Sequence, residues 1–230
     1  MIPYLDRTTP FPSVSSALNE PNGLLAAGAD LSKQRLFTAY SSGIFPWFSQ
    51  GEPVLWWSPN PRTIFDLNQF QPSRSLKRFI RKSKLKITLN KDFNAVLDQC
   101  AMPRTSQAET WISNEMKLAY INLHQQKLAH SVEVWQNEAL VGGIYGVSIG
   151  KLFCGESMFS RISNGSKVAL TYLIEHLRSE QFPIIDCQVE NAHLVSLGAI
   201  NIERDKYIQI VKNTKDKILP SNFWEKKQFS

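Results

Sequence analysis

The chain has 230 residues, of which 43% are hydrophobic and 20% charged, and its net charge is +6. These values are close to globular averages, so they exclude a disordered, collagen-like or coiled-coil chain. The longest uncharged stretch, residues 36–51, has 16 residues and contains Pro46, which is too short for a membrane helix. The positive net charge favours a polyanionic partner without identifying it.

Residues 1–62 hold eight of the twelve prolines, which predicts an irregular segment with short strands. One helix fits inside this segment, with Asp30 or Ser32 as its N-cap and its end near residues 41–43. We expect a small Pro-rich N-terminal subdomain over residues 1–62, followed by a larger domain over residues 63–230.

The larger domain is predicted to begin with helices and to continue with strands. Periodicity and caps favour helices starting after Ser73 and over residues 93–100 and 114–126, with a short strand at 86–90. Three strands at 131–135, 139–147 and 151–159 read as an antiparallel meander. A helix over residues 164–180, capped by Ser163 or Asn164, and a buried strand over 183–189 follow. This order is typical of an α+β fold.

Seven basic residues and no acidic one lie between residues 74 and 86. On a helix, Arg74, Lys77, Arg78 and Arg81 share one face, opposite an apolar face. Such a row could follow the phosphates of a nucleic acid, and the alternative is a solvated helix face; the absence of any acidic residue favours the polyanion. The basic residues of this segment are Arg74, Lys77, Arg78, Arg81, Lys82, Lys84 and Lys86.

Tryptophans are concentrated in the Pro-rich segment, where Trp47, Trp56 and Trp57 lie close together in the sequence. They either form the core of the small subdomain or stack on unpaired bases. Trp111, at a predicted loop-to-helix junction, has the same two interpretations.

Three polar residues interrupt apolar strand segments. Asp186 and Gln188 share one face of the last predicted strand, and Glu156 lies within the meander. Burying such groups is costly unless they are paired or line a cleft, so they form either a satisfied structural network or a functional site. In a functional site Asp186 could hold charge beside an ammonium, and the Gln188 side-chain oxygen could accept a hydrogen bond from an amine.

Sequence patterns for metals, nucleotides and covalent catalysis are absent. The odd set Cys100, Cys154 and Cys187 contains no Cys-x-x-Cys pair, the histidines lack metal-ligand spacing, and no glycine-rich phosphate loop occurs. We therefore expect packed, reduced thiols, no metal and no cofactor. The N-terminal residues lack the pattern of a secretory signal, so we expect a cytoplasmic protein without membrane contact.

Six segments together resemble leucyl/phenylalanyl-tRNA–protein transferases, and they extend over nearly the whole chain. The segments are EPNGLLA (20–26), GIFPWFS (43–49), WWSPNPR (56–62), GGIYG (142–146), FCGESMFS (153–160) and IDCQV (185–189). The resemblance implies an N-terminal subdomain on a GNAT-like mixed α/β domain. It also implies transfer of leucine or phenylalanine, and less readily methionine, from aminoacyl-tRNA to an N-terminal arginine or lysine, which marks the acceptor protein for degradation. We expect a monomer.

The resemblance also implies roles for individual residues. Asp186 and Gln188 stand in relay positions of the family motif, Glu156 lies in its strand motif, and Asn191 follows Gln188 in the same segment. Glu156 with Asp186 would attract the basic acceptor side chain. Trp47 and Trp111 would hold the terminal adenine of the tRNA, with Tyr40 and Tyr120 nearby. The aminoacyl pocket would be lined by Ile144, Phe153 and Met158. The basic helix would contact the tRNA body.

Two other functions compete with this interpretation. A CoA-dependent N-acyltransferase could use the same fold, but it predicts a pyrophosphate loop near residue 164, where the sequence reads SNGS. A non-catalytic RNA-binding module would use the aromatic residues for stacking and the acidic ones for structure.

Overall fold

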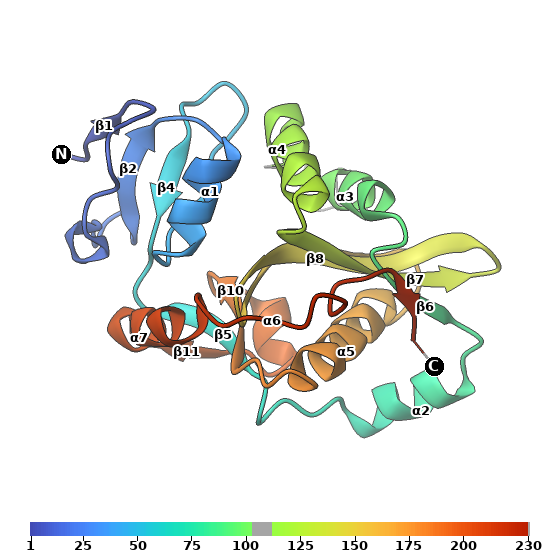
Figure 1. The fold of residues 1–230 in the computed structure, drawn as a ribbon. Coiled ribbons are helices and arrows are strands. Elements are labelled where there is room, and N and C mark those ends of the chain that lie inside the picture. The colour runs from blue at the N-terminus through green and yellow to red at the C-terminus, as the bar shows by residue number, and fades with distance from the viewer. Residues whose placement is uncertain (103–111, 230) are drawn as a thin grey trace.

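The protein, described here from a computed structural model over residues 1–102 and 112–229, contains two β-sheets with helices around them. The α+β prediction is confirmed (Figure 1). Among the described residues, no helix has the length and apolar character that crossing a membrane requires.

The small sheet is built from the Pro-rich segment and has the strand order β1-β2-β4-β3. Its strands are β1 (Tyr4–Leu5), β2 (Leu24–Gly28), β3 (Phe45–Pro46) and β4 (Leu55–Trp57). The strands are short, as the prolines predict, and β1 and β2 pair in parallel. A 3-10 turn (Val14–Ser16) and helix α1 (Lys33–Tyr40) complete this part. Ser32 is the N-cap of α1, and its hydroxyl accepts a hydrogen bond from the backbone N–H of Arg35.

The large sheet has eight strands in the order β11-β5-β10-β9-β8-β7-β6-β12. Its strands are β5 (Arg62–Asp66), β6 (Lys86–Leu89), β7 (Ala129–Gln136), β8 (Ala139–Ile149), β9 (Leu152–Ser160), β10 (Ile184–Gln188), β11 (Ile200–Ile202) and β12 (Lys227–Gln228). The predicted meander is present as the antiparallel strands β7, β8 and β9. Strands β9 and β10 are parallel and are connected through a helix.

Helices cover both faces of the large sheet (Figure 1). They are α2 (Arg74–Lys82), α3 (Phe93–Ala101), α4 (Asn114–Gln125), α5 (Gly165–Arg178), α6 (Ala192–Ser196) and α7 (Arg204–Thr214). Apolar side chains of α3 and α4 pack with those of α1 and the small sheet in one core. Side chains of α2 and α5 belong to a second core on the other face.

Of the two caps predicted for α5, the structure has Asn164 at the N-cap position, with φ 67° but without a side-chain capping hydrogen bond. The hydroxyl of Ser160 instead accepts the hydrogen bond from the backbone N–H of Ser166, at 3.0 Å. Gly142 and Gly165 let α5 approach strand β8, because a Cβ atom on Gly142 would meet the Gly165 carbonyl carbon at 2.6 Å.

Strand β5 begins at Arg62, directly after the small sheet, and lies inside the large sheet between β10 and β11. Arg62, the last residue of the predicted subdomain, is therefore already part of the large sheet. The division into domains at residues 62 and 63 stays a prediction, because one apolar core contains Trp56 of the small sheet together with Tyr120 and Tyr207 of the larger part.

Candidate active site between the two sheets

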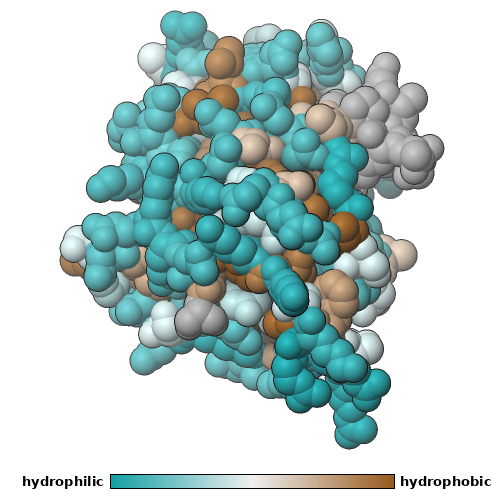
Figure 2. All heavy atoms as spheres, turned by 90° about the vertical axis from the view of Figure 1, so that its right-hand side faces the viewer, coloured by the Kyte–Doolittle hydropathy of each residue, from teal (hydrophilic) through white to brown (hydrophobic). Residues whose placement is uncertain are grey.

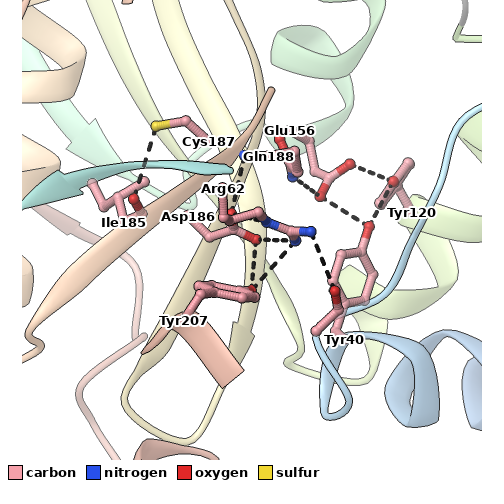
Figure 3. A network of polar contacts seen from close by, with 10 residues as sticks. Tyr40, Arg62, Tyr120, Glu156, Ile185, Asp186, Cys187, Gln188 and Tyr207 are labelled. Atoms are coloured by element: carbon pink, nitrogen blue, oxygen red, sulfur yellow. Dashed lines mark hydrogen bonds and ion pairs between the residues drawn. The ribbon is translucent and has the colours of Figure 1, made fainter. Parts of the chain in front are cut away.

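A network of polar side chains lies at strands β5, β9 and β10, and side chains from helices α1, α4 and α7 reach into it (Figure 3). It contains two carboxylates with different partners. Asp186 on β10 pairs with Arg62 and Tyr207, and Glu156 on β9 accepts hydrogen bonds from Tyr40, Tyr120 and Gln188. The structure brings Glu156, Asp186 and Gln188 together, and the catalytic roles predicted for them stay predictions.

Asp186 is completely buried and its charge is balanced by Arg62, which is 1% exposed. The Arg62 Nε and Nη2 atoms donate to the two carboxylate oxygens of Asp186 at 2.8 and 2.7 Å, and the Tyr207 hydroxyl donates to Oδ2 at 2.8 Å. The rings of Phe45 and Tyr207 lie 4.7 and 4.4 Å from the guanidinium carbon. Burial alone would lower the pKa of Arg62, but the carboxylate of Asp186 raises it above the ordinary value.

Glu156 is half-buried and receives three hydrogen bonds from uncharged donors. Tyr40 Oη and Gln188 Nε2 donate to its Oε1 at 2.9 and 3.2 Å, and Tyr120 Oη donates to its Oε2 at 2.5 Å. Burial raises the pKa of Glu156 to about 7, against the opposing effect of the two tyrosine hydrogen bonds. The pKa values of both tyrosines are raised mainly by burial, so they act as neutral donors.

The backbone at Gln188 places its side chain beside Glu156. The pairing of β10 with β5 shifts between Asp186 and Gln188, and Gln188 has φ 60°, a rare conformation for a residue other than glycine. Gln188 contacts Asp186 through its backbone, since the Gln188 N–H donates to Asp186 Oδ1 at 3.0 Å. Within the described part of the chain, Gln188 Oε1 accepts no hydrogen bond, so this oxygen is free for a substrate donor.

The cysteines near the site are not arranged as nucleophiles. Cys154 is buried and Cys187 is half-buried, and burial is the largest cause that raises the pKa of each thiol. A thiol with a raised pKa carries little thiolate at neutral pH. Among the described residues there is also no group of three or more histidine, cysteine or acidic side chains that could hold a metal ion.

The tryptophans of the Pro-rich segment divide between core and surface. Trp56 is buried, and its Nε1 donates to the Gly28 carbonyl, as expected of a core residue. Trp47 is 44% exposed and packs against Trp57, with 5.7 Å between the ring centroids. Trp47 is thus an accessible aromatic side chain, whereas Trp111 lies outside the described residues.

Ile144, Phe153 and Met158 lie together on the face of the large sheet that α5 covers. Ile144 and Phe153 are buried there, and Met158 packs against the same core. Glu156 instead faces Tyr40 and Tyr120, in the other core. The aminoacyl pocket assigned to these three residues stays a prediction.

Asn191 follows the site directly and has a structural contact of its own. It is exposed, and its Oδ1 accepts a hydrogen bond from the backbone N–H of Leu194 at the start of α6. Its predicted contact with substrate is untested.

The basic residues of α2 are solvent-exposed, and the apolar residues of this helix pack on the core, as its periodicity predicts. Within the described part of the chain, none of the basic residues of α2 forms an ion pair with an acidic side chain. Figure 2 shows one side of the molecule as mainly hydrophilic, with apolar residues in small separate areas.

Arg62 and Tyr207 are site residues that sequence reasoning missed. Arg62 is separated from Asp186 by 124 positions, and no local pattern connects two such residues. A signal for Arg62 existed, because it ends the WWSPNPR segment. Tyr207 lies in α7, a helix for which the sequence analysis gave no boundaries.

The fold and the site together define a two-part α+β protein with a polar, largely buried site between its parts. Comparison with protein families identifies which one. Residues 64–212 match the family model "Leucyl/phenylalanyl-tRNA protein transferase", and residues 29–60 match the model of its N-terminal domain. The chain belongs to the leucyl/phenylalanyl-tRNA protein transferase family, and the resemblance seen in the sequence is confirmed.

Similar proteins of this family cover nearly the whole chain. A leucyl/phenylalanyl-tRNA–protein transferase of Vibrio campbellii is 53% identical over 90% of this chain and 87% of its own length. That of Pseudomonas aeruginosa is 50% identical over 94% of this chain and 96% of its own. Among solved structures, L-PGS from Bacillus licheniformis gives a TM-score of 0.39 at 13% identity over 73% of this chain and 53% of that one, which supports no further argument.

Proposed function

We propose that this protein transfers leucine or phenylalanine, and less readily methionine, from aminoacyl-tRNA to the N-terminal arginine or lysine of acceptor proteins, marking them for degradation. Membership of the family supports this reaction. The observation that carries it for this chain is the Gln188 side chain, which Glu156 holds by its Nε2 so that its Oε1 is available to a substrate amine.

The proposed reaction is the aminolysis of an ester that tRNA charging has already activated. The α-amine nitrogen of the acceptor attacks the carbonyl carbon, the C–O bond to the terminal ribose breaks, and the ribose oxygen takes up the proton that the amine loses. Gln188 Oε1 accepts a hydrogen bond from the amine and orients it. Because the ester is already reactive, positioning supplies much of the rate and no covalent enzyme intermediate is needed.

The proposal keeps the other predicted substrate contacts. Trp47, with Trp111, holds the terminal adenine, and Asn191 lies beside the acceptor. Ile144, Phe153 and Met158 surround the aminoacyl side chain in this proposal, but they pack in the core on the opposite face of the large sheet from Glu156, so no contact observed among the described residues connects them to this centre. The exposed basic residues of α2 bind the tRNA backbone, where each neutralised phosphate adds salt-dependent affinity. The larger part is GNAT-like in this proposal, and the protein acts as a cytoplasmic monomer.

Packing at the start of α5 argues against the CoA-dependent alternative. The CoA pyrophosphate would need free backbone N–H groups there. Gly165 and Ser166 are buried, the Ser166 N–H donates to Ser160 Oγ, and the Gly165 N–H donates to the Ile162 carbonyl at 3.2 Å. These two backbone N–H groups are therefore already engaged within the protein and are not free for a pyrophosphate.

The test is single-turnover transfer of labelled leucine from leucyl-tRNA to a peptide that begins with arginine. Gln188→Ala should slow transfer by roughly 100-fold, with tRNA affinity within twofold of wild type. Gln209→Ala, on the exposed surface of α7, is the matched control. A wild-type protein that binds tRNA without transferring leucine would be an RNA-binding module, and one that binds acetyl-CoA in calorimetry would be an N-acyltransferase.

A further inference from the structure

A cleft of about 290 Å³ opens beside the end of strand β10. Its walls include Trp47 and Trp57 from the small sheet and Val189 from the chain just after Gln188. Glu190 also lines it, and no other ionisable side chain of the described residues does. The cleft therefore combines aromatic surface with one negative charge, a combination that suits an organic cation.

Glu190 is held in place without being neutralised. Asn201 Nδ2 donates to Glu190 Oε2 at 2.5 Å, and Thr63 Oγ1 donates to Asn201 Oδ1 at 2.8 Å. No lysine or arginine of the described residues forms an ion pair with Glu190. An exposed carboxylate without a basic partner, in a chain with net charge +6, is a conspicuous negative site.

The two acids inside the network are poor sites for an incoming cation. Asp186 is buried and already forms a two-point ion pair with Arg62. Glu156 receives hydrogen bonds from two tyrosines and Gln188, and with a pKa of about 7 it is only partly ionised at neutral pH. Neither therefore offers a full, accessible negative charge, as Glu190 does.

We infer that Glu190 is the carboxylate that binds the basic side chain of the acceptor's N-terminal residue, with the indole of Trp57 as an aromatic wall of the cleft. This inference rests on the proposed function. Gln188 and Glu190 are two residues apart, so their Cα atoms are separated by at most about 7 Å. The side chain of an arginine or lysine spans such a distance. The inference places the α-amine at Gln188 and the guanidinium or ammonium group at Glu190, at the end of the cleft that Val189 and Glu190 line.

The position of Trp47 fits the same arrangement. Its indole lines this cleft and packs against Trp57. If the terminal adenine of the tRNA stacks on Trp47, the basic acceptor side chain binds next to the same indole. The aminoacyl ester and the attacking amine are then brought to one place, as aminolysis requires.

The experiment compares two peptides that differ only in their first residue, arginine or citrulline, which has nearly the same shape but no charge. For wild type, KM should be about three- to tenfold lower with arginine, a range that matches an exposed ion pair with an aromatic neighbour. In Glu190→Gln this ratio should fall close to one, while kcat and tRNA affinity stay within twofold of wild type. Glu138→Gln, in the exposed β7–β8 turn, should keep the wild-type ratio.

Two results would overturn the inference separately from the proposed function. Transfer by wild type together with an unchanged arginine-to-citrulline ratio in Glu190→Gln removes the role of Glu190 but leaves the reaction intact. A ratio that disappears in Glu156→Gln and persists in Glu190→Gln assigns the recognition to Glu156 instead. A wild-type protein that transfers leucine to neither peptide overturns the proposed function and this inference with it.

Discussion

Glu156 combines a raised pKa with a contact to the side chain proposed to orient the substrate amine. Ionised Glu156 accepts a hydrogen bond from Gln188 Nε2 and leaves Gln188 Oε1 free. Protonated Glu156 can donate to Gln188 Oε1 and occupy that oxygen. The protonation state of Glu156 therefore decides which end of the Gln188 amide is available to substrate.

Transfer should consequently depend on pH through Glu156. With its pKa at about 7, the ionised fraction of Glu156 rises by about tenfold from pH 6 to pH 8. The acceptor α-amine also loses its proton in this range, but Glu156→Gln keeps that titration and removes the other. We expect the wild-type to Glu156→Gln rate ratio to rise with pH, as measured by single-turnover transfer. A constant ratio would contradict the positioning role of Glu156.

The raised pKa of Glu156 also predicts a pH dependence of stability, which should fall with rising pH while the transfer rate rises. Between pH 4.5 and about 7 the folded state holds a proton on Glu156 that the unfolded chain has lost, so the free energy of unfolding falls as pH rises through this range. Glu156→Gln cannot titrate. Relative to wild type, this variant should therefore gain stability on the order of 2 kcal/mol from pH 4.5 to pH 8 in urea unfolding. An unchanged difference between the two proteins would show that Glu156 ionises normally.

Because Asp186 pairs with buried Arg62, mutation of Asp186 is expected to lower the stability of the protein as well as its activity. Asp186→Asn is nearly isosteric, and from sequence alone it is a mild change that removes only a charge. In the structure it leaves the buried guanidinium of Arg62 without its counter-ion, which costs about 3–5 kcal/mol. We expect Asp186→Asn to lower the melting temperature strongly.

The control for this expectation is the double variant Asp186→Leu with Arg62→Met. It removes both charges, so its free energy of unfolding should be closer to wild type than that of either single variant. If the single losses simply add in urea unfolding, the two side chains are not energetically coupled. Because Asp186→Asn is expected to be destabilised, slow transfer by this variant indicates a catalytic role only if the variant is folded under the assay conditions.

At the scale of single residues, sequence reasoning was most effective where a polar group interrupts an apolar strand. Asp186, Gln188 and Glu156 were found in this way, and they lie in one network. The partners of Asp186 could not be found, because burial of a charge indicates that a partner exists without saying where. The direction of the Gln188 side chain was also hidden, because it depends on a bulge and a positive φ that alternation does not encode.

At the scale of elements, helices and strands with strong periodicity were predicted well and the others were not. The basic helix, the helices at 93–101 and 114–125, and the meander agree with the sequence analysis within a few residues. Strands β11 and β12 have three and two residues and owe their existence to pairing with distant strands. Asn164 stands at the N-cap position of α5, as one of the two predicted caps, but Ser160, outside the helix, supplies the hydroxyl that accepts a hydrogen bond from the first turn.

The basic residues of helix α2 can be replaced to test tRNA binding with little effect on the stability of the protein. Lys77, Arg78 and Arg81 are exposed, and exposed charges contribute little to folding. Replacing all three with alanine should weaken tRNA binding and lower the slope of log Kd against log salt concentration by about two to three. The melting temperature should stay nearly unchanged.

The control for α2 replaces basic residues elsewhere on the surface. Lys206 and Lys217 are exposed at and beyond α7, and their replacement should change tRNA affinity much less. Binding measured at several salt concentrations decides the matter. If the α2 triple variant keeps the wild-type salt dependence, the helix is a solvated face and the tRNA follows another path.

At the scale of the whole molecule, the site depends on both parts being packed together. Gly43, in the turn after α1, and Phe45 of strand β3 contact Arg62, which in turn holds Asp186 of the large sheet. Arg204 at the start of α7 donates to the Ser58 carbonyl at 2.8 Å, which forms a second connection. Movement of the small sheet would therefore disturb the position of β10 and of Gln188.

This packing predicts that the two parts unfold as one cooperative unit. One apolar core includes Tyr40 from α1 and Trp56 from the small sheet together with Tyr120 and Tyr207 from the larger part, and all four side chains are buried. Separating the parts would expose this core and break the ion pair of Arg62 with Asp186.

Native-state hydrogen exchange should give β4 and β8 similar opening free energies. Residues 1–61 expressed alone should remain unfolded by circular dichroism, since so short a chain buries too little apolar surface without its partner. Exchange of β4 at much lower denaturant than β8 would instead show that the small sheet opens independently, and the substrate site would then form only when the small sheet is docked.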